Sequence, residues 1–156
     1  MSEPLPVPRA ARHVRGQWKS LANVHGTGQR FHATLAEDLP PAARRWITHA
    51  VAENTPLARV VRLEMRGQIR LRAWWSFTAT QILAPGDGFI WAATAKVGGL
   101  PILGYDRFTD GRGEMRWRLG GLIPVMSAHG PDVTASAAGR LAGEFFRAEI
   151  TDAHFR

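Results

Sequence analysis

Cysteine is absent from this chain of 156 residues, which excludes disulfide bonds and thiolate chemistry. No stretch approaches the roughly 18 consecutive apolar residues that a membrane-spanning helix needs. Prolines and basic residues interrupt residues 1–16, so they contain no apolar segment of signal-peptide length. We therefore expect a cytoplasmic protein.

Lysine is nearly absent as well, because Lys19 and Lys96 are the only two in the chain. The formal charge of +7 is thus carried almost wholly by arginine. A basic balance predicts attraction to nucleic acid or to an anionic membrane. Many of the arginines, however, occupy alternate positions of the predicted strands, which is the usual way to make one face of a sheet polar. The sequence favours this second interpretation over a nucleic-acid groove.

What the chain does contain is a long alternation of apolar and polar residues between positions 60 and 125. One face of its first part carries Val61, Leu63, Met65, Ile69 and Leu71. The other face carries Arg62, Glu64, Arg66, Gln68, Arg70 and Arg72. A period of two predicts a half-buried β-strand, and residues 60–71 would span on the order of 40 Å. Long strands joined by tight hairpins form large curved sheets.

Three helices are predicted around this sheet. Residues 9–22 place Val14, Trp18 and Leu21 on one stripe. A second helix begins at residues 40–41, a pair of prolines, and ends at residues 54–56; we expect it to lay Trp46 and Ile47 on the sheet. A third, alanine-rich helix covers residues 131–142, and residues 146–151 then alternate as a last strand. We divide the chain into a basic N-terminal segment, residues 1–38, and a helix-plus-sheet domain, residues 39–156.

Two hairpins set the expected register of the sheet. The loop at residues 84–88 pairs Leu83 with Phe89, Gln81 with Trp91 and Ala79 with Ala93. A turn at residues 110–113 would place Phe108 opposite Met115, Asp106 opposite Trp117 and Gly104 opposite Leu119. In that register Tyr105, Arg107, Arg116 and Arg118 lie on the opposite face from Asp106.

Five stretches resemble a bacterial family of uncharacterised proteins. They are residues 39–46 (LPPAARRW), 55–71 (TPLARVVRLEMRGQIRL), 77–91 (FTATQILAPGDGFIW), 104–125 (GYDRFTDGRGEMRWRLGGLIPV) and 130–142 (GPDVTASAAGRLA). The Tyr-Asp-Arg and Gly-Leu-Ile-Pro-Val runs are the most specific. The resemblance implies a strongly bent antiparallel sheet, similar to the half-barrel of lipoprotein-carrier proteins, and no established activity.

Relatives of this kind look longer, with further strands before a terminal strand similar to residues 145–155. The chain therefore resembles an internally shortened member, whose sheet has an open edge and an uncovered apolar face. Such edges predict self-association. The expected fold class is α+β: a curved, mostly antiparallel β-sheet forming an incomplete half-barrel, with N-terminal helices and one helix near the C-terminus.

The apolar face of the sheet is the first candidate site. Its proposed ligand-binding residues are Phe77, Gln81, Phe89, Trp91, Asp106, Met115 and Trp117. Ligand sites are mostly hydrophobic with a few placed polar groups, here Gln81 and Asp106. The alternative is that these residues are ordinary core, packed against the helix around Trp46 and the helix from Val133.

Asp106 is the second candidate, because a carboxylate on an apolar face is costly. Burial would raise its pKa, which suits a general acid or a group that orients a ligand. The alternative, which we favour, is a structural pair with an arginine of a neighbouring strand or helix, Arg107 being nearest in sequence.

Other chemistry has weaker support. The six histidines form no cluster at metal-ligand spacing, and Ser127 with His129 lacks the glycine-flanked elbow of a hydrolase. We predict no catalytic residue, no metal and no cofactor. The leading hypothesis is a noncatalytic carrier or binder of an apolar or amphipathic ligand on the concave face. The alternatives are nucleic-acid or anionic-surface binding through the arginine-rich face, and an enzyme using Asp106.

Overall fold

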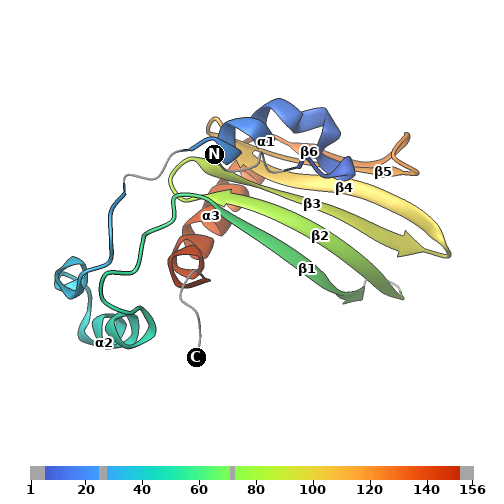
Figure 1. Cartoon of the computed structure of the whole chain (residues 1–156). Helices are drawn as coiled ribbons and strands as arrows, with labels where there is room; N and C mark the ends of the chain where they lie inside the picture. Colours follow the sequence, from blue (N-terminus) through green and yellow to red (C-terminus); the bar gives the residue numbers. More distant parts are fainter. Residues whose placement is uncertain (1–5, 25–27, 71–72, 152–156) are drawn as a thin grey trace.

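The computed structural model describes residues 6–24, 28–70 and 73–151. Its centre is one antiparallel sheet whose six strands follow each other in chain order. The strands are β1 (Val61–Arg70), β2 (Trp74–Ala84), β3 (Gly88–Val97), β4 (Leu100–Thr109), β5 (Arg112–Leu119) and β6 (Ile123–His129). With helices before and after this curved, open sheet, the expected α+β class is confirmed (Figure 1).

Helices cover both faces of the sheet. The short helix η1 (Arg9–Val14) and α1 (Arg15–Ala22) pack on the convex face, and α3 (Pro131–Thr151) packs on the concave face (Figure 1). The predicted stripe of the first helix is confirmed, because Val14, Trp18 and Leu21 are buried. These side chains form the convex core with Ile82, Ala84, Ile90, Ala92, Leu103 and Tyr105. The concave core is smaller and contains Val61, Leu83, Phe89 and Leu141.

The first hairpin has the predicted register, with Leu83 opposite Phe89 and Gln81 opposite Trp91. The register of the second hairpin was wrong by two residues. Phe108 lies opposite Gly113, Asp106 opposite Met115 and Gly104 opposite Trp117. The turn has two residues, not four, because Asp110 and Gly111 both adopt positive φ, 54° and 68°, as a type I′ turn requires. A shift of two leaves every side chain on its predicted face.

The end of the sheet differs from the prediction in two further ways. β6 extends the sheet past residue 125, where the predicted alternation ends, and its pairing with β5 shifts register between Trp117 and Arg118. The predicted last strand is wrong, because residues 146–151 continue α3. Residues 143–151 contain no proline that would end the helix, and the alanine-rich turns before them favour its continuation. The rest of the predicted terminal strand, residues 152–155, lies outside the described residues, as do Leu71 and Arg72 of the first strand.

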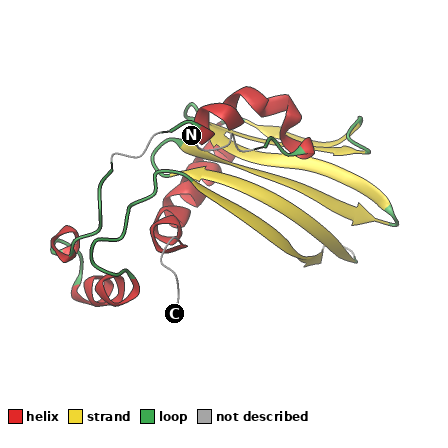
Figure 2. Ribbon diagram, in the orientation of Figure 1, coloured by secondary structure: helices red, strands yellow, loops and turns green. Residues whose placement is uncertain are grey.

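The second predicted helix does not cover the sheet. α2 (Pro41–Ala50) and the short helix η2 (Ala33–Ala36) lie apart from it (Figure 2). Trp46 is 52% exposed, and no residue of α2 is buried, so the prediction that Trp46 and Ile47 pack on the sheet was wrong. The segment closes on itself instead. The Phe31 N–H donates to the Thr55 carbonyl (2.8 Å), and the Asn54 N–H donates to the Phe31 carbonyl (2.7 Å).

Candidate functional site

The seven residues predicted to bind a ligand lie on one face of the sheet, the concave face that α3 partly covers. Phe77 and Gln81 come from β2, Phe89 and Trp91 from β3, Asp106 from β4, and Met115 and Trp117 from β5. The strand pairing places them side by side because each occupies the same phase of the two-residue repeat.

Three of their rings form a continuous aromatic row across the sheet. The ring centroids of Phe77 and Trp91 are 6.0 Å apart, and those of Trp91 and Trp117 are 5.8 Å apart. Trp117 reaches Trp91 across β4 because Gly104 lies between them. A Cβ at Gly104 would stand 2.3 Å from the Trp117 ring, so only glycine leaves room for the row. All three rings are half-buried.

A polar cluster lies beside this row, beneath α3. The Arg140 guanidinium donates to Gln81 Oε1 (3.1 Å) and to Glu144 Oε1 (2.8 Å). The Gln81 amide donates in turn to the other oxygen of Glu144. Gln81 is 2% exposed, and these partners explain how its amide is tolerated there. The guanidinium carbon of Arg140 also lies 4.6 Å from the centre of the Phe89 ring, within cation–π distance.

Asp106 joins the cluster to the aromatic row. Trp117 Nε1 donates to Asp106 Oδ1 (3.2 Å), and Arg140 Nη1 lies 3.8 Å from Asp106 Oδ2. Desolvation by burial raises the pKa of Asp106 above its ordinary value, although the Trp117 hydrogen bond and the Arg140 charge act in the opposite direction. The direction is the one expected from the sequence. The nearby arginine belongs to a helix, as one alternative allowed, and it is not Arg107.

Arg107 faces the opposite side of the sheet, where it pairs with Glu114. Arg107 Nη2 is 2.8 Å from Glu114 Oε2, and Arg116 Nε is 2.6 Å from Glu114 Oε1. Burial raises the pKa of Glu114, but the hydrogen bond from Arg107 and the charges of Arg107 and Arg116 outweigh it and lower that pKa overall. Tyr105 is only 3% exposed. Two of the three arginines predicted on the face of Tyr105, Arg107 and Arg116, are thus paired with Glu114.

Sequence reasoning missed Arg140 and Glu144. A signal existed, because Ala137, Arg140, Leu141 and Glu144 recur at helical spacing, three, four and seven residues from Ala137. Ala137 and Leu141 pack on the concave core. Arg140 and Glu144 occupy the same side of α3 and therefore face the sheet as well. An ion pair spaced i, i+4 on a helix is more often exposed. From the sequence alone, Arg140 and Glu144 are therefore interpreted as a surface pair.

A cavity of about 340 Å³ opens between α3 and the sheet, next to the polar cluster. Its lining includes the apolar residues Phe89, Met115, Val133 and Ala137 and the charged residues Asp106, Arg107, Glu114, Asp132 and Arg140. Of the seven predicted residues, three line this cavity: Phe89, Asp106 and Met115. Trp91, Trp117 and Phe77 form the aromatic row, and Gln81 is enclosed by Arg140 and Glu144.

In the described part of the chain, no group of three or more His, Asp or Glu side chains could hold a metal ion. Within the same residues, no helix is long and apolar enough to cross a membrane.

Comparison with known proteins identifies a family for this chain, but that family has no assigned function. No curated protein and no solved structure matches this chain. Residues 29–148 match a family of unknown function; they include α2, the whole sheet and most of α3. The chain therefore belongs to the family of unknown function DUF6544.

Proposed function

We propose that this chain is a noncatalytic binder or carrier of an apolar or amphipathic small molecule held on the concave face. The observation that carries the proposal is the cavity of about 340 Å³ under α3, whose lining combines apolar residues with the charged residues Asp106, Arg107, Glu114, Asp132 and Arg140. Its volume lies within the range of roughly 300–1,000 Å³ typical of small-molecule pockets.

The aromatic row supports an extended apolar part of the ligand. Phe77, Trp91 and Trp117 are half-buried side by side, and α3 contacts mainly β4, β5 and β6. An acyl chain or a flat ring system lying on this row would remove apolar area from water, at about 25 cal/mol per Å².

Arg140 supports a polar or anionic group at the other end of the ligand. Its Nε and Nη2 hydrogen-bond to Glu144 and Gln81. Its Nη1 is 3.8 Å from Asp106, which is beyond hydrogen-bond distance. A carboxylate entering the cavity can accept from Nη1 without displacing either existing bond. The ligand class that fits best is therefore an amphiphile with a single carboxylate.

Titration with a fluorescent fatty acid such as cis-parinaric acid tests this site. Ala137→Trp fills the cavity and should weaken binding about tenfold or more, equal to a loss of about 1.4 kcal/mol. Ala135→Trp is the matched control, because Ala135 is an exposed residue of α3 that does not line the cavity. Equal affinity in both variants would overturn the proposal.

Two further measurements distinguish a filled cavity from a misfolded Ala137→Trp variant. Ser136→Phe also narrows the cavity, and Ser136 is exposed, so folding should tolerate the change. Native mass spectrometry of the gently purified chain should detect a discrete adduct mass that Ala137→Trp removes. Bare protein that also fails to bind the fatty acid would contradict the carrier function.

A further inference from the structure

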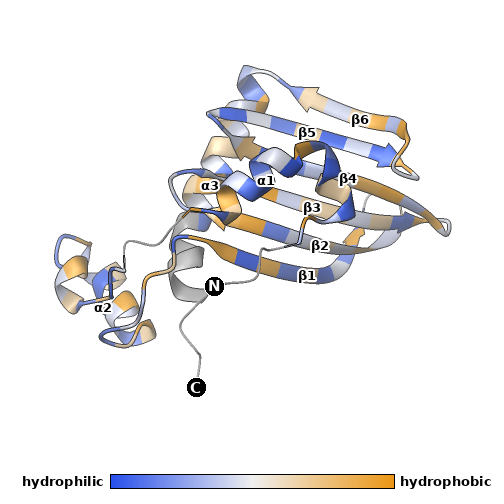
Figure 3. Cartoon of the chain, turned by 45° about the horizontal axis from the view of Figure 1, so that its top comes forward, coloured by the Kyte–Doolittle hydropathy of each residue, from blue (hydrophilic) through white to orange (hydrophobic). Residues whose placement is uncertain are grey.

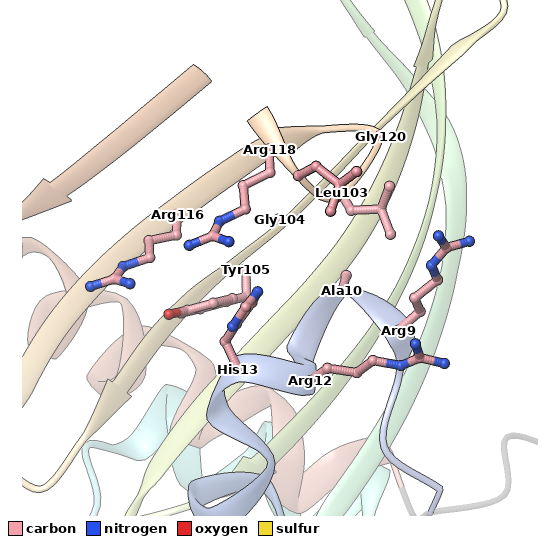
Figure 4. Close-up of a pocket in the computed structure, with 12 residues that line it drawn as sticks. Arg9, Ala10, Arg12, His13, Leu103, Gly104, Tyr105, Arg116, Arg118 and Gly120 are labelled. Carbon is pink, nitrogen blue, oxygen red and sulfur yellow. The ribbon is translucent and has the colours of Figure 1, made fainter. Parts of the chain in front are cut away.

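A second cavity, of about 360 Å³, lies on the convex face between η1, strands β4 and β5, and the turn that leads into β6 (Figure 4). Its lining includes Arg9, Arg12, His13, Arg116, Arg118 and Leu122, and it contains no carboxylate. The concave site does not use any of these residues. Arg9, Arg12 and His13 also precede the part of the chain that matches the family.

The charge of this pocket is largely uncompensated. Arg116 is held by Glu114 at 2.6 Å. Arg9, Arg12 and Arg118 form no salt bridge with any other residue that the structure describes. A guanidinium donates through a planar fork that matches the oxygens of phosphate, so arginine is the preferred residue for phosphate recognition.

The two sides of the pocket supply these arginines from different elements. In Figure 4, Arg118 extends from β5 toward His13 and the ring of Tyr105, while Arg9 and Arg12 project from η1. Tyr105 is 3% exposed and forms part of the pocket floor. A phosphate between Arg118 and His13 would meet donors from both η1 and β5.

An exposed apolar turn adjoins the same pocket. Leu122 is 81% exposed and also lines the pocket, and Ile123 is 62% exposed. The turn begins with Gly120 and Gly121, at φ of 63° and 81°, and it stands out as apolar at one end of the sheet in Figure 3. Apolar side chains beside basic ones are the arrangement of proteins that bind bilayer surfaces. The apolar groups enter the interface and the cations meet lipid phosphates.

We propose that this pocket and turn form a docking surface for an anionic lipid bilayer. Arg9, Arg12 and Arg118 bind headgroup phosphates, and Leu122 and Ile123 enter the boundary between headgroups and acyl chains. The net charge of +7 favours the same partner. The proposal is independent of the concave site, which lies on the other face of the sheet.

Flotation of the full chain with vesicles tests the proposal. Binding is expected to vesicles of phosphatidylcholine mixed with phosphatidylglycerol, and not to phosphatidylcholine alone. Arg118→Gln and Arg12→Gln should each weaken binding roughly fivefold, which corresponds to about 1 kcal/mol for each basic residue near an anionic surface. Leu122→Ser should also weaken binding to the same vesicles. Because this loss is apolar and not electrostatic, the difference between variant and wild type should persist at higher salt concentration.

Arg112→Gln is the matched control. Arg112 is an exposed arginine of the same strand as Arg118, outside the pocket and without a salt bridge among the described residues. It removes the same charge, so an equal loss in this variant would show general attraction and overturn the site. Ala137→Trp should leave vesicle binding unchanged, which separates this proposal from the function proposed above. Circular dichroism verifies the fold of each variant.

Two other outcomes would overturn the bilayer as partner. One is binding of inorganic phosphate that depends on Arg118 without any binding of vesicles, which would indicate a soluble anion. The other is binding of a single-stranded oligonucleotide that is unaffected by Leu122→Ser and stronger than binding of vesicles, which would indicate a nucleic-acid surface.

Discussion

At the scale of single residues, the proposed ligand site on the concave face centres on the Asp106 carboxylate and the Arg140 guanidinium. These two groups lie close together without a hydrogen bond between them. Asp106 accepts from Trp117 and lies 3.8 Å from Arg140, so its charge is only partly compensated. Arg140 keeps one nitrogen available while its other donors are bonded to Gln81 and Glu144. Residues in this state are suited to orient a ligand, because the ligand completes their hydrogen bonding.

Asp106→Asn should change how stability depends on pH. Because burial raises the pKa of Asp106, the folded chain binds more protons at this group than the unfolded chain. This group therefore lowers the free energy of unfolding as pH rises from its unfolded pKa, about 3.9, through the raised folded pKa. The variant lacks the group, so its stability relative to the wild type should increase across that window. Urea unfolding at several pH values measures the difference.

The comparison cancels the other carboxylates, which both proteins share. Glu114 has a lowered pKa and contributes the opposite slope, with stability lost as pH falls through its folded pKa. A difference between variant and wild type that stays constant with pH would show that Asp106 titrates normally.

At the scale of elements, the placement of α3 depends on the absence of a side chain in β5. A Cβ at Gly113 would stand 2.6 Å from the Val133 carbonyl oxygen and 2.7 Å from Thr134 Cα. The Gly113 N–H also donates to the Thr134 hydroxyl (3.1 Å). The first turn of α3 therefore rests directly on the backbone of β5, which fixes the height of the cavity roof.

Gly113→Ala should push α3 away from the sheet. Both close contacts are with backbone atoms, which cannot turn aside, so we expect a loss of about 1–3 kcal/mol in the free energy of unfolding. Hydrogen exchange should become faster in residues 131–144, and the affinity for cis-parinaric acid should fall, because Val133 lines the cavity.

Gly143→Ala is the control for this substitution. A Cβ there would have no neighbour within 4 Å, and alanine favours a helix over glycine by up to about 1 kcal/mol. An equal loss of stability in both variants would show that the contact between Gly113 and α3 is not the cause.

The faces of the sheet could be predicted from the sequence, but the helices around it only in part. The two-residue period assigned Gln81 and Asp106 to the concave side, and a register error of two residues could not change that. The position of α2 could not be predicted, because it depends on hydrogen bonds between Phe31 and residues 54–55. Arg140 was missed because an i, i+4 pair on an alanine-rich helix does not reveal which face meets the sheet.

Comparing the loss of stability in Trp18→Ala with that in Trp46→Ala tests which helix supports the sheet. Trp18 of α1 is fully buried at 0% exposure, and Trp46 of α2 is 52% exposed. Loss of the buried ring should cost about 3–5 kcal/mol. Loss of the exposed ring should stay within about 0.5 kcal/mol. Thermal and urea unfolding measure both, and a large effect at Trp46 would mean that α2 packs on another part of the molecule.

At the scale of the whole molecule, the open sheet has two edges that differ in protection. β1 carries Arg62, Glu64, Arg66 and Arg70 on its convex side, and charged edge strands resist pairing. β6 carries no charged residue between positions 123 and 128, and Val125 and Met126 are 51% and 53% exposed. The interpretation of the chain as an internally shortened family member stays a prediction, and it would account for an edge of this kind.

Self-association should therefore occur through β6, by antiparallel pairing with β6 of a second copy around a twofold axis. Pro124 lacks an N–H, so the pairing should begin after it, at Val125. Sedimentation equilibrium should detect a dimer that forms with rising concentration. Val125→Lys should shift the equilibrium to monomer, because a charge on an edge strand opposes pairing. Gln68→Lys adds the same charge to exposed β1 and should leave the dimer intact; a monomer in that control would place the interface at β1 instead.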